Sequence, residues 1–166
     1  MKQTENGVDL AAVSRVARNI DLRDIRVVQL EAACSPAPEG PLEPQITFDC
    51  KGALVSPGQL NVVCDYTMTA NAAGAPAASV RAAYLLVYDF SGDPPTERDI
   101  EQFARGNGVY HSWPFLRQLL FDLTAKMGLP PLTLPVFQAL SRTQTEDAEK
   151  PSTPKKPRRQ KALSGQ

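Results

Sequence analysis

Apolar and polar residues alternate along four segments within residues 1–90, and this period of two predicts four β-strands. The segments are residues 21–31, 45–51, 59–70 and 80–90. The third segment alternates most cleanly, and one of its faces carries Leu60, Val62, Cys64, Tyr66 and Met68. The first and fourth segments carry apolar residues on both faces, so we expect each of them to meet a second surface.

The segments between these strands are rich in turn and loop residues. Residues 35–44 (SPAPEGPLEP) contain four prolines, which predicts a semi-rigid crossing loop. Ser56-Pro57-Gly58 is typical of a turn, and residues 71–79 (NAAGAPAAS) predict a flexible loop of small residues. Near the N-terminus, apolar residues within residues 8–19 recur at helical spacing and predict a short helix or a frayed arm.

After residue 95 the apolar period changes to that of a helix. Thr96 is a good N-cap with Asp99 three residues later, and one or two apolar turns follow until residues 106–108 (GNG) interrupt them. Residues 115–127 follow Trp113-Pro114 and predict a longer helix with proline in its first turn. Its apolar stripe consists of Leu116, Leu119, Leu120, Leu123 and Met127.

Gly128 is placed to end this helix, and Pro130 and Pro131 prevent its continuation. Residues 132–137 (LTLPVF) predict a short extended segment. Four strands followed by a long amphipathic helix give an α+β fold with a four-stranded antiparallel sheet. One helix covers only one face of a sheet, so the exposed apolar face predicts oligomerisation, an apolar ligand groove, or both.

The distribution of charge separates a tail from the globule. The chain has 166 residues, enough for one domain, and its basic and acidic residues balance at 18 each. Residues 1–140 carry a net charge of −4, whereas residues 141–166 carry +4. This tail lacks apolar periodicity, so we expect it to be disordered. A role as a solubilising tail competes with docking to nucleic acid or an acidic protein; no aromatic residue is present to stack on a base, and a nucleic-acid partner is not expected.

The compartment and the redox state follow from what the chain contains. The N-terminus is polar and no segment is long and apolar enough to span a membrane, which predicts a cytoplasmic protein. Cys34, Cys50 and Cys64 are odd in number and form no CxxC or Cys/His pair. We therefore expect them to act as small hydrophobic residues in a reducing compartment.

Residues suited to catalysis or cofactor binding are sparse. The single histidine, His111, adjoins Ser112, but the chain has no GxSxG motif, and we expect Ser112 to cap a helix. The GNG segment lacks the strand and the Lys-Ser/Thr of a phosphate loop, and the carboxylates have no metal-ligand spacing. The sequence predicts no enzyme, no metal site and no cofactor.

Residues 110–137 (YHSWPFLRQLLFDLTAKMGLPPLTLPVF) resemble the C-terminal half of the SecB family of export chaperones. In that family an aromatic-proline helix start leads into a long helix and then a Gly-containing, proline-rich exit. Here residues 113–117 (WPFLR) match the start and residues 127–137 (MGLPPLTLPVF) match the exit. These two motifs resemble the divergent SecB-like branch, which includes chaperones of toxin–antitoxin systems, more closely than housekeeping SecB.

This resemblance implies an ATP-independent holdase, a homotetramer built as a dimer of dimers, and apolar grooves that bind unfolded or precursor polypeptides or an antitoxin. It divides the chain into an arm or short helix (1–19), a SecB-like chaperone domain (20–140) and the basic tail (141–166). The second helix and the acidic tail of SecB have no counterpart here. The fourth strand offers an acid only at Asp89, and the first strand offers Glu31 near its end. We therefore do not expect the SecA motor as a partner.

Two sets of residues are the candidates for these roles. The peptide-binding candidates are Phe48, Tyr66, Met68, Tyr84, Leu86 and Tyr88, for which packing under the helix is the competing interpretation. The oligomer-interface candidates are Leu116, Leu119, Leu120 and Leu123. The alternative function is a SecB-fold adaptor for one dedicated partner, with the basic tail docking an acidic protein or nucleic acid.

Overall fold

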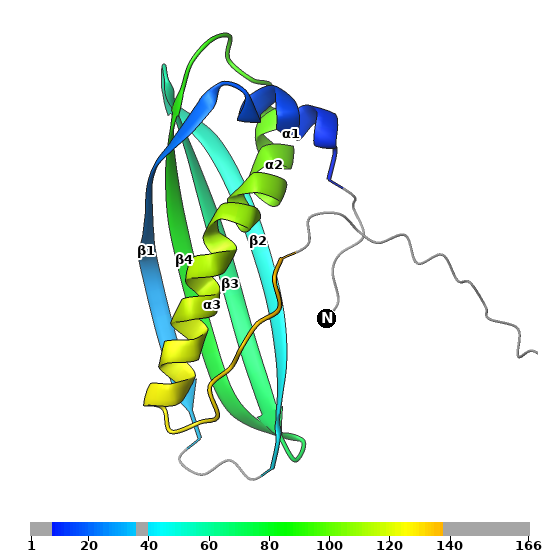
Figure 1. Cartoon of the computed structure of the whole chain (residues 1–166), viewed down its shortest axis with the longest axis vertical. Helices are drawn as coiled ribbons and strands as arrows, with labels where there is room; N and C mark the ends of the chain where they lie inside the picture. The colour runs from blue at the N-terminus through cyan, green and yellow to red at the C-terminus, as the bar shows by residue number, and fades with distance from the viewer. Residues whose placement is uncertain (1–7, 36–39, 138–166) are drawn as a thin grey trace, which may run out of the picture.

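The structure, a computed structural model, describes residues 8–35 and 40–137, and its centre is a four-stranded antiparallel sheet (Figure 1). The strands are β1 (Ile20–Cys34), β2 (Leu42–Ser56), β3 (Gln59–Ala72) and β4 (Ala75–Phe90). Their order is β1-β4-β3-β2, so β1 and β2 are the edge strands. The sequence predicts a crossing loop for the connection between them, and residues 36–39 of that connection lie outside the described part.

All four predicted strands are present, and each is longer than its pattern indicates, most of all β2, which has 15 residues and includes residues 42–44 of the predicted crossing loop. The predicted flexible loop at 71–79 is wrong: most of it is strand, and the hairpin turns at Ala73 and Gly74. Both turn residues have positive φ, 49° and 79°, which suits a tight two-residue hairpin turn. Alanine-rich flanks carry no alternating signal, so the pattern could not reveal these strand ends.

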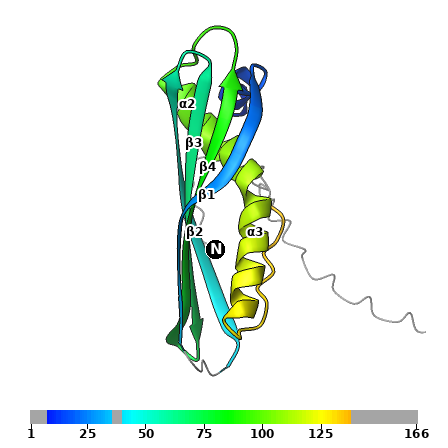
Figure 2. The same cartoon turned by 90° about the vertical axis from the view of Figure 1, so that its left-hand side faces the viewer.

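The sheet has an inner face, which the helices cover, and an opposite outer face (Figure 2). The inner face carries the alternating residues predicted for the third strand, and all of them are buried. Across the register, Leu60 lies opposite Tyr88, Val62 opposite Leu86, and Cys64 opposite Tyr84. Each such pair places two apolar side chains under the helices, which explains why this face forms the core.

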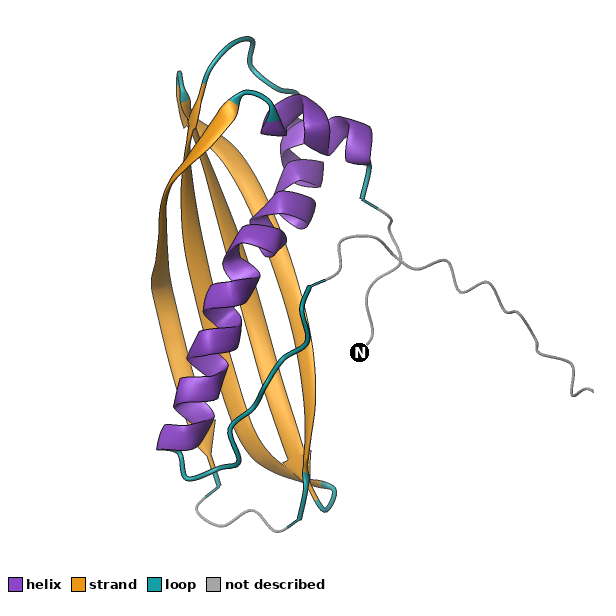
Figure 3. Ribbon diagram, viewed as in Figure 1, coloured by secondary structure: helices purple, strands orange, loops and turns teal. Residues whose placement is uncertain are grey.

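The helices run as one continuous rod: α2 (Glu97–Phe103), the π-helix η1 (Ala104–Gly108) and α3 (Val109–Lys126), as Figure 3 shows. The predicted N-cap at Thr96 is confirmed, because its hydroxyl accepts a hydrogen bond from the Asp99 N–H at 3.2 Å. The predicted interruption at residues 106–108 is wrong. These residues belong to η1, so the chain passes from α2 to α3 without a break.

Glycines let this rod approach the sheet closely. A Cβ on Gly108 would come within 2.8 Å of Val62 Cγ1 on β3, and one on Gly52 of β2 would come within 2.6 Å of Ile100 Cγ2 on α2. Both distances are too short for a real Cβ. The glycines therefore serve helix–sheet contact rather than breaking the helix.

The start of α3 lies earlier than the sequence predicts. The helix begins at Val109, so Pro114 lies inside it and Ser112 is not a cap. Instead the Ser112 hydroxyl donates to the Gly108 carbonyl at 2.7 Å, one turn back. Pro114 and Tyr110 are both exposed, so water can reach the Tyr110 carbonyl that the proline leaves without an N–H donor.

The predicted end of α3 is confirmed. Gly128 has a φ of 73°, and the Leu129 N–H donates to the Thr124 carbonyl at 2.9 Å, which closes the last turn. From here residues 129–137, which we call the strap, run back alongside α3 toward β2 (Figure 1).

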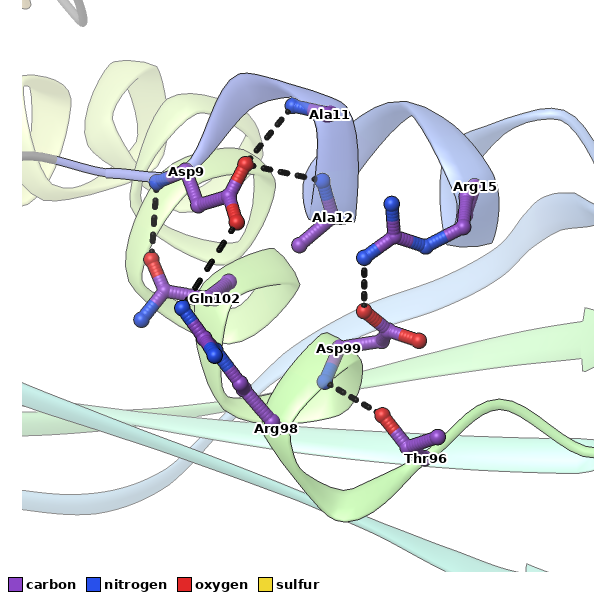
Figure 4. Close-up of polar contacts among 8 residues, drawn as sticks. All are labelled: Asp9, Ala11, Ala12, Arg15, Thr96, Arg98, Asp99 and Gln102. Atoms are coloured by element: carbon purple, nitrogen blue, oxygen red, sulfur yellow. Dashed lines mark hydrogen bonds and ion pairs between the residues drawn. The ribbon is translucent and has the colours of Figure 1, made fainter.

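A short N-terminal helix, α1 (Leu10–Ala17), lies where the sequence predicts a short helix or a frayed arm, and it docks on α2 (Figure 4). Asp9 caps α1 by accepting hydrogen bonds from the N–H groups of Ala11 and Ala12. The Asp9 N–H donates to Gln102 Oε1 of α2 at 2.9 Å. Polar contacts thus fix the orientation of α1, while its apolar face packs into the core.

Candidate functional site

The six predicted peptide-binding residues all lie on the inner face of the sheet. Phe48 belongs to β2, Tyr66 and Met68 to β3, and the others to β4. Five of them are buried by the helical layer in this chain, and Phe48 alone keeps exposed surface. Their role in binding stays a prediction, and Phe48 is the member that a ligand can reach without movement of the helices.

Phe48 belongs to an aromatic cluster at the β2 side of α3. Its ring centroid lies 5.9 Å from that of Tyr66 and 6.4 Å from that of Phe137 on the strap. Trp113 of α3 completes the cluster, 6.2 Å from Tyr66 and 5.5 Å from Phe137. The rings meet at tilted or edge-on angles, which are favourable for aromatic pairs. The cluster joins sheet, helix and strap.

Side chains of α3 hold the strap by hydrogen bonds to its main-chain groups. Trp113 Nε1 donates to the Pro135 carbonyl, and Arg117 Nε donates to the Leu134 carbonyl, each at 2.8 Å. The Leu132 N–H donates to Thr124 Oγ1 at 2.9 Å. Leu134 is buried by this arrangement. The strap is thus an extended apolar segment anchored without a strand partner.

The polar side chains near His111 form hydrogen bonds within the fold. Since the Ser112 hydroxyl gives its proton to Gly108, the Tyr66 hydroxyl, 2.7 Å away, donates to Ser112. His111 Nδ1 instead pairs with the Tyr88 hydroxyl at 2.9 Å, and burial lowers the pKa of His111. Ser112 and His111 therefore have separate partners, and they do not form a nucleophile–base pair.

Two rows of apolar side chains remain exposed in this chain. The first, which we call the β1 row, consists of Leu22, Val27 and Leu30 on the inner side of the edge strand. The second, the α3 rings, consists of Tyr110, Phe115 and Phe121 on the helix. Each of the six side chains is more than two-fifths exposed.

The oligomer-interface candidates divide between core and surface. Leu116 and Leu120 are buried against this chain's own sheet, while Leu119 and Leu123 are half-buried. Their interface role stays a prediction. The α3 rings lie outside the stripe predicted for this helix, which followed its leucines and Met127; the aromatic residues on the opposite side of the same helix were the available signal.

The charged side chains on the outer face of the sheet pair with one another. Arg81 forms two hydrogen bonds with the Asp65 carboxylate, at 2.7 and 3.2 Å, and the guanidinium lowers the pKa of that carboxyl. Lys51 lies 3.2 Å from Asp49. An open depression between these pairs is lined by strand residues of both signs, so the face presents no single charge to a partner.

Residues 8–35 and 40–137 offer no cluster of metal ligands and no membrane-spanning helix. There, no three His, Cys, Asp or Glu side chains gather closely enough to hold a metal ion. None of the helices in those residues is long and apolar enough to cross a membrane. The apolar rows and the aromatic cluster are the remaining candidates for a functional surface.

No protein-family model matches the chain, but individual proteins do. It is 27% identical over 153 residues to the SecB-like chaperone Rv1957 of Mycobacterium tuberculosis strain H37Rv, with 78% of this chain and 84% of that protein covered. The chain is thus similar in sequence to the SecB-like chaperones. The SecB-like chaperone MT2006 of strain CDC 1551 matches with the same identity and coverage. These matches confirm the resemblance that residues 110–137 indicate.

The fold agrees with that of a SecB-like chaperone of known structure. The structure of M. tuberculosis Rv1957 in complex with a ChAD peptide from the Rv1956 HigA1 antitoxin superposes with a TM-score of 0.71 at 24% identity. The superposition covers 77% of this chain and 96% of that chain. It confirms the predicted fold class, a four-stranded antiparallel sheet followed by a long helix.

Proposed function

We propose that this protein is a non-enzymatic, ATP-independent holdase of the cytoplasm that binds unfolded or precursor polypeptides. The observation that carries the proposal is the aromatic cluster at the β2 edge, where Phe48 keeps exposed surface that an apolar segment can reach without movement of the helices. Its similarity to SecB-like chaperones supports the same reading.

An antitoxin is one client class that we propose, and exported precursors are the other. The relative Rv1957 binds a peptide of the HigA1 antitoxin, which makes an extended antitoxin segment a reasonable ligand here. SecA remains outside the proposal. Asp89 lies 3.6 Å from Arg23, and Glu31 is in register with Arg81, so both of these acids have basic neighbours.

For the assembly we propose a homotetramer built as a dimer of dimers. β1 is an edge strand of 15 residues with exposed apolar side chains, and such an edge is prone to pair with another chain. The α3 rings face away from the sheet and offer a second surface. Pairing through β1 and then through α3, with the flank of Leu119 and Leu123, would cover both.

Once the β1 row and the α3 rings are used for assembly, the edge of β2 is left for clients. Phe48 lies on that edge strand and contacts the aromatic cluster. We therefore propose the Phe48 side of the cluster as the first contact for an apolar client segment. Aromatic side chains suit this role because they bury a large area with few rotatable bonds.

Aggregation suppression tests the proposal directly. A holdase should prevent light scattering by several unrelated unfolding proteins at stoichiometric amounts. An adaptor with a dedicated partner, the alternative function, would protect one protein or none. Phe48→Ala should weaken suppression while Thr47→Ala, its exposed neighbour on the outer face, should not. Equal activity of both variants would remove Phe48 from the client site.

Native mass spectrometry tests the assembly. We expect a species of four times the chain mass of 18.0 kDa. A chain that remains monomeric at micromolar concentration would contradict the proposed tetramer, whatever the result of the aggregation assay.

A further inference from the structure

Two cysteines face each other across neighbouring strands. Cys50 of β2 and Cys64 of β3 are direct partners in the antiparallel register, on the inner face, and both are free thiols. Directly opposed residues in antiparallel strands have Cα atoms about 4.5–5.5 Å apart. Disulfides span Cα separations of about 4.4–6.8 Å. The Cα separation expected for this pair therefore suits a disulfide.

The helical layer seals this pair from solvent. Cys50 is 2% exposed and Cys64 is fully buried. Gly108 of η1 lies directly over Cys64, since a Cβ on Gly108 would come within 3.2 Å of the Cys64 sulfur and 2.8 Å of Val62 Cγ1. Oxidants can reach the thiols only when this part of the layer lifts away from β3.

Burial also suppresses the thiolate, which is the reactive form of a cysteine. The hydrogen bond with the Cys64 thiol and the apolar surroundings raise the pKa of Cys50 above its usual value. Thiol–disulfide exchange requires a thiolate that an oxidant can reach. Both requirements fail in the closed protomer, so the same pair is inert when covered and competent when exposed.

We propose that Cys50 and Cys64 form a gated dithiol, which becomes a cross-strand disulfide when the helical layer opens in the presence of a small disulfide oxidant. With oxidised glutathione, one cysteine thiolate attacks a glutathione sulfur, which releases one glutathione and leaves a mixed disulfide. The second thiolate then attacks the protein sulfur of that mixed disulfide and displaces the other glutathione. Overall, two protein thiols become one disulfide and oxidised glutathione becomes two reduced molecules.

Closure of the layer would then bury the disulfide and protect it from reductants. An opening event under oxidising conditions would therefore leave a lasting link between β2 and β3. This link adjoins the Phe48–Tyr66 pair, two positions along the same strands. The inference does not depend on the proposed chaperone function, because its test measures mass and not client binding.

The test uses the full chain with Cys34→Ser, which removes the exposed third thiol. The protein is treated with oxidised glutathione in buffer and in urea below the concentration at which circular dichroism reports loss of the sheet. Intact mass should show the loss of two hydrogen atoms, at least about 100-fold faster in urea, since local opening controls access. Adding Cys64→Ser should abolish this product and leave a glutathione adduct.

A glycine pair locates the gate. Gly108→Ala crowds β3 and should speed oxidation in buffer about 10-fold or more by lifting the layer. Gly106→Ala is the matched control, because its Cβ would meet Val8 and Val13 near α1 and not the sheet. If Gly108→Ala does not fold, the urea series decides alone. Glutathione adducts without an internal disulfide, or equal rates in buffer and urea, would overturn the proposal, and equal acceleration by both glycine variants would overturn the gate at Gly108.

Discussion

The Arg15 guanidinium of α1 lies 2.6 Å from the Asp99 carboxylate of α2, and this contact joins two residues that are 84 positions apart in the chain. The Asp99 N–H also donates to Thr96, the N-cap of α2. Asp99 therefore takes part both in the N-terminal cap of α2 and in the attachment of α1 to α2. A carboxylate in the first turn of a helix is also favoured by the helix dipole.

This arrangement predicts how stability depends on pH. The hydrogen bond from Arg15 lowers the pKa of Asp99 in the folded chain. A lowered carboxyl pKa contributes stability above the unfolded pKa of about 3.9 and loses it as pH falls through the folded pKa. We expect Asp99→Asn to lower the melting temperature at pH 7, and the difference from the parent protein to vanish toward about pH 2.

Arg15→Met serves as the second arm of that experiment, because it removes the cation and leaves Asp99 in place. Arg15→Met should reduce the pH dependence of the melting temperature in the same way, as measured by thermal unfolding followed by circular dichroism. Parallel melting profiles of all three proteins across the acid range would mean that the ion pair contributes nothing to stability.

Leu120 tests which surface the α3 stripe serves. Its side chain is fully buried against the sheet, so Leu120→Asp places a carboxylate in an apolar core. We expect a loss of unfolding free energy on the order of 3–5 kcal/mol and loss of the native circular dichroism spectrum. Ala125→Asp, on the exposed side of the same helix, should cost less than about 1 kcal/mol. A folded Leu120→Asp protein of smaller oligomeric state would instead place Leu120 at the interface, as the sequence analysis predicts.

Short-range periodicity was enough to predict most of the fold. The alternation from Leu60 to Met68 identified β3 and its buried face, and Thr96 and Gly128 marked two helix ends. In each case the signal lies within a few residues of the element that it describes. The fold class followed from the order of these elements, and the resemblance came from residues 110–137.

Features set by contacts between distant segments could not be predicted in this way. Gly106 and Gly108 read as helix breakers, but Gly108 is needed where η1 touches Val62, which lies far away in sequence. Alternation correctly placed the six peptide-binding candidates on one face of the sheet. It cannot say whether a helix or a ligand covers that face. Only the structure separates Phe48, at the edge, from the five buried members.

The anchors of the strap predict a local change that the single tryptophan can report. Arg117→Met keeps the apolar part of the side chain but removes the donor to the Leu134 carbonyl. We expect a loss of about 1 kcal/mol in unfolding free energy. Trp113, the one tryptophan in the chain, should shift its emission to the red as the strap loosens. Gln118→Ala, which affects an exposed side chain on α3, is the control; an unchanged spectrum in Arg117→Met would show that the contacts of Trp113 and Thr124 hold the strap without Arg117.

Leu30 tests the proposed use of β1 as the assembly edge. It lies on the inner side of β1, opposite Ala82 of β4, and is 45% exposed in the single chain. Leu30→Lys should therefore change the free energy of folding by no more than about 0.5 kcal/mol, but a charge on an edge strand opposes pairing with another chain. We expect native mass spectrometry to show smaller species with an unchanged circular dichroism spectrum. Val55→Lys makes the same exchange at an exposed site on β2, the other edge strand, and should leave the tetramer intact. If Val55→Lys dissociates the assembly and Leu30→Lys does not, the subunits associate through β2, and the client surface must then be sought on β1.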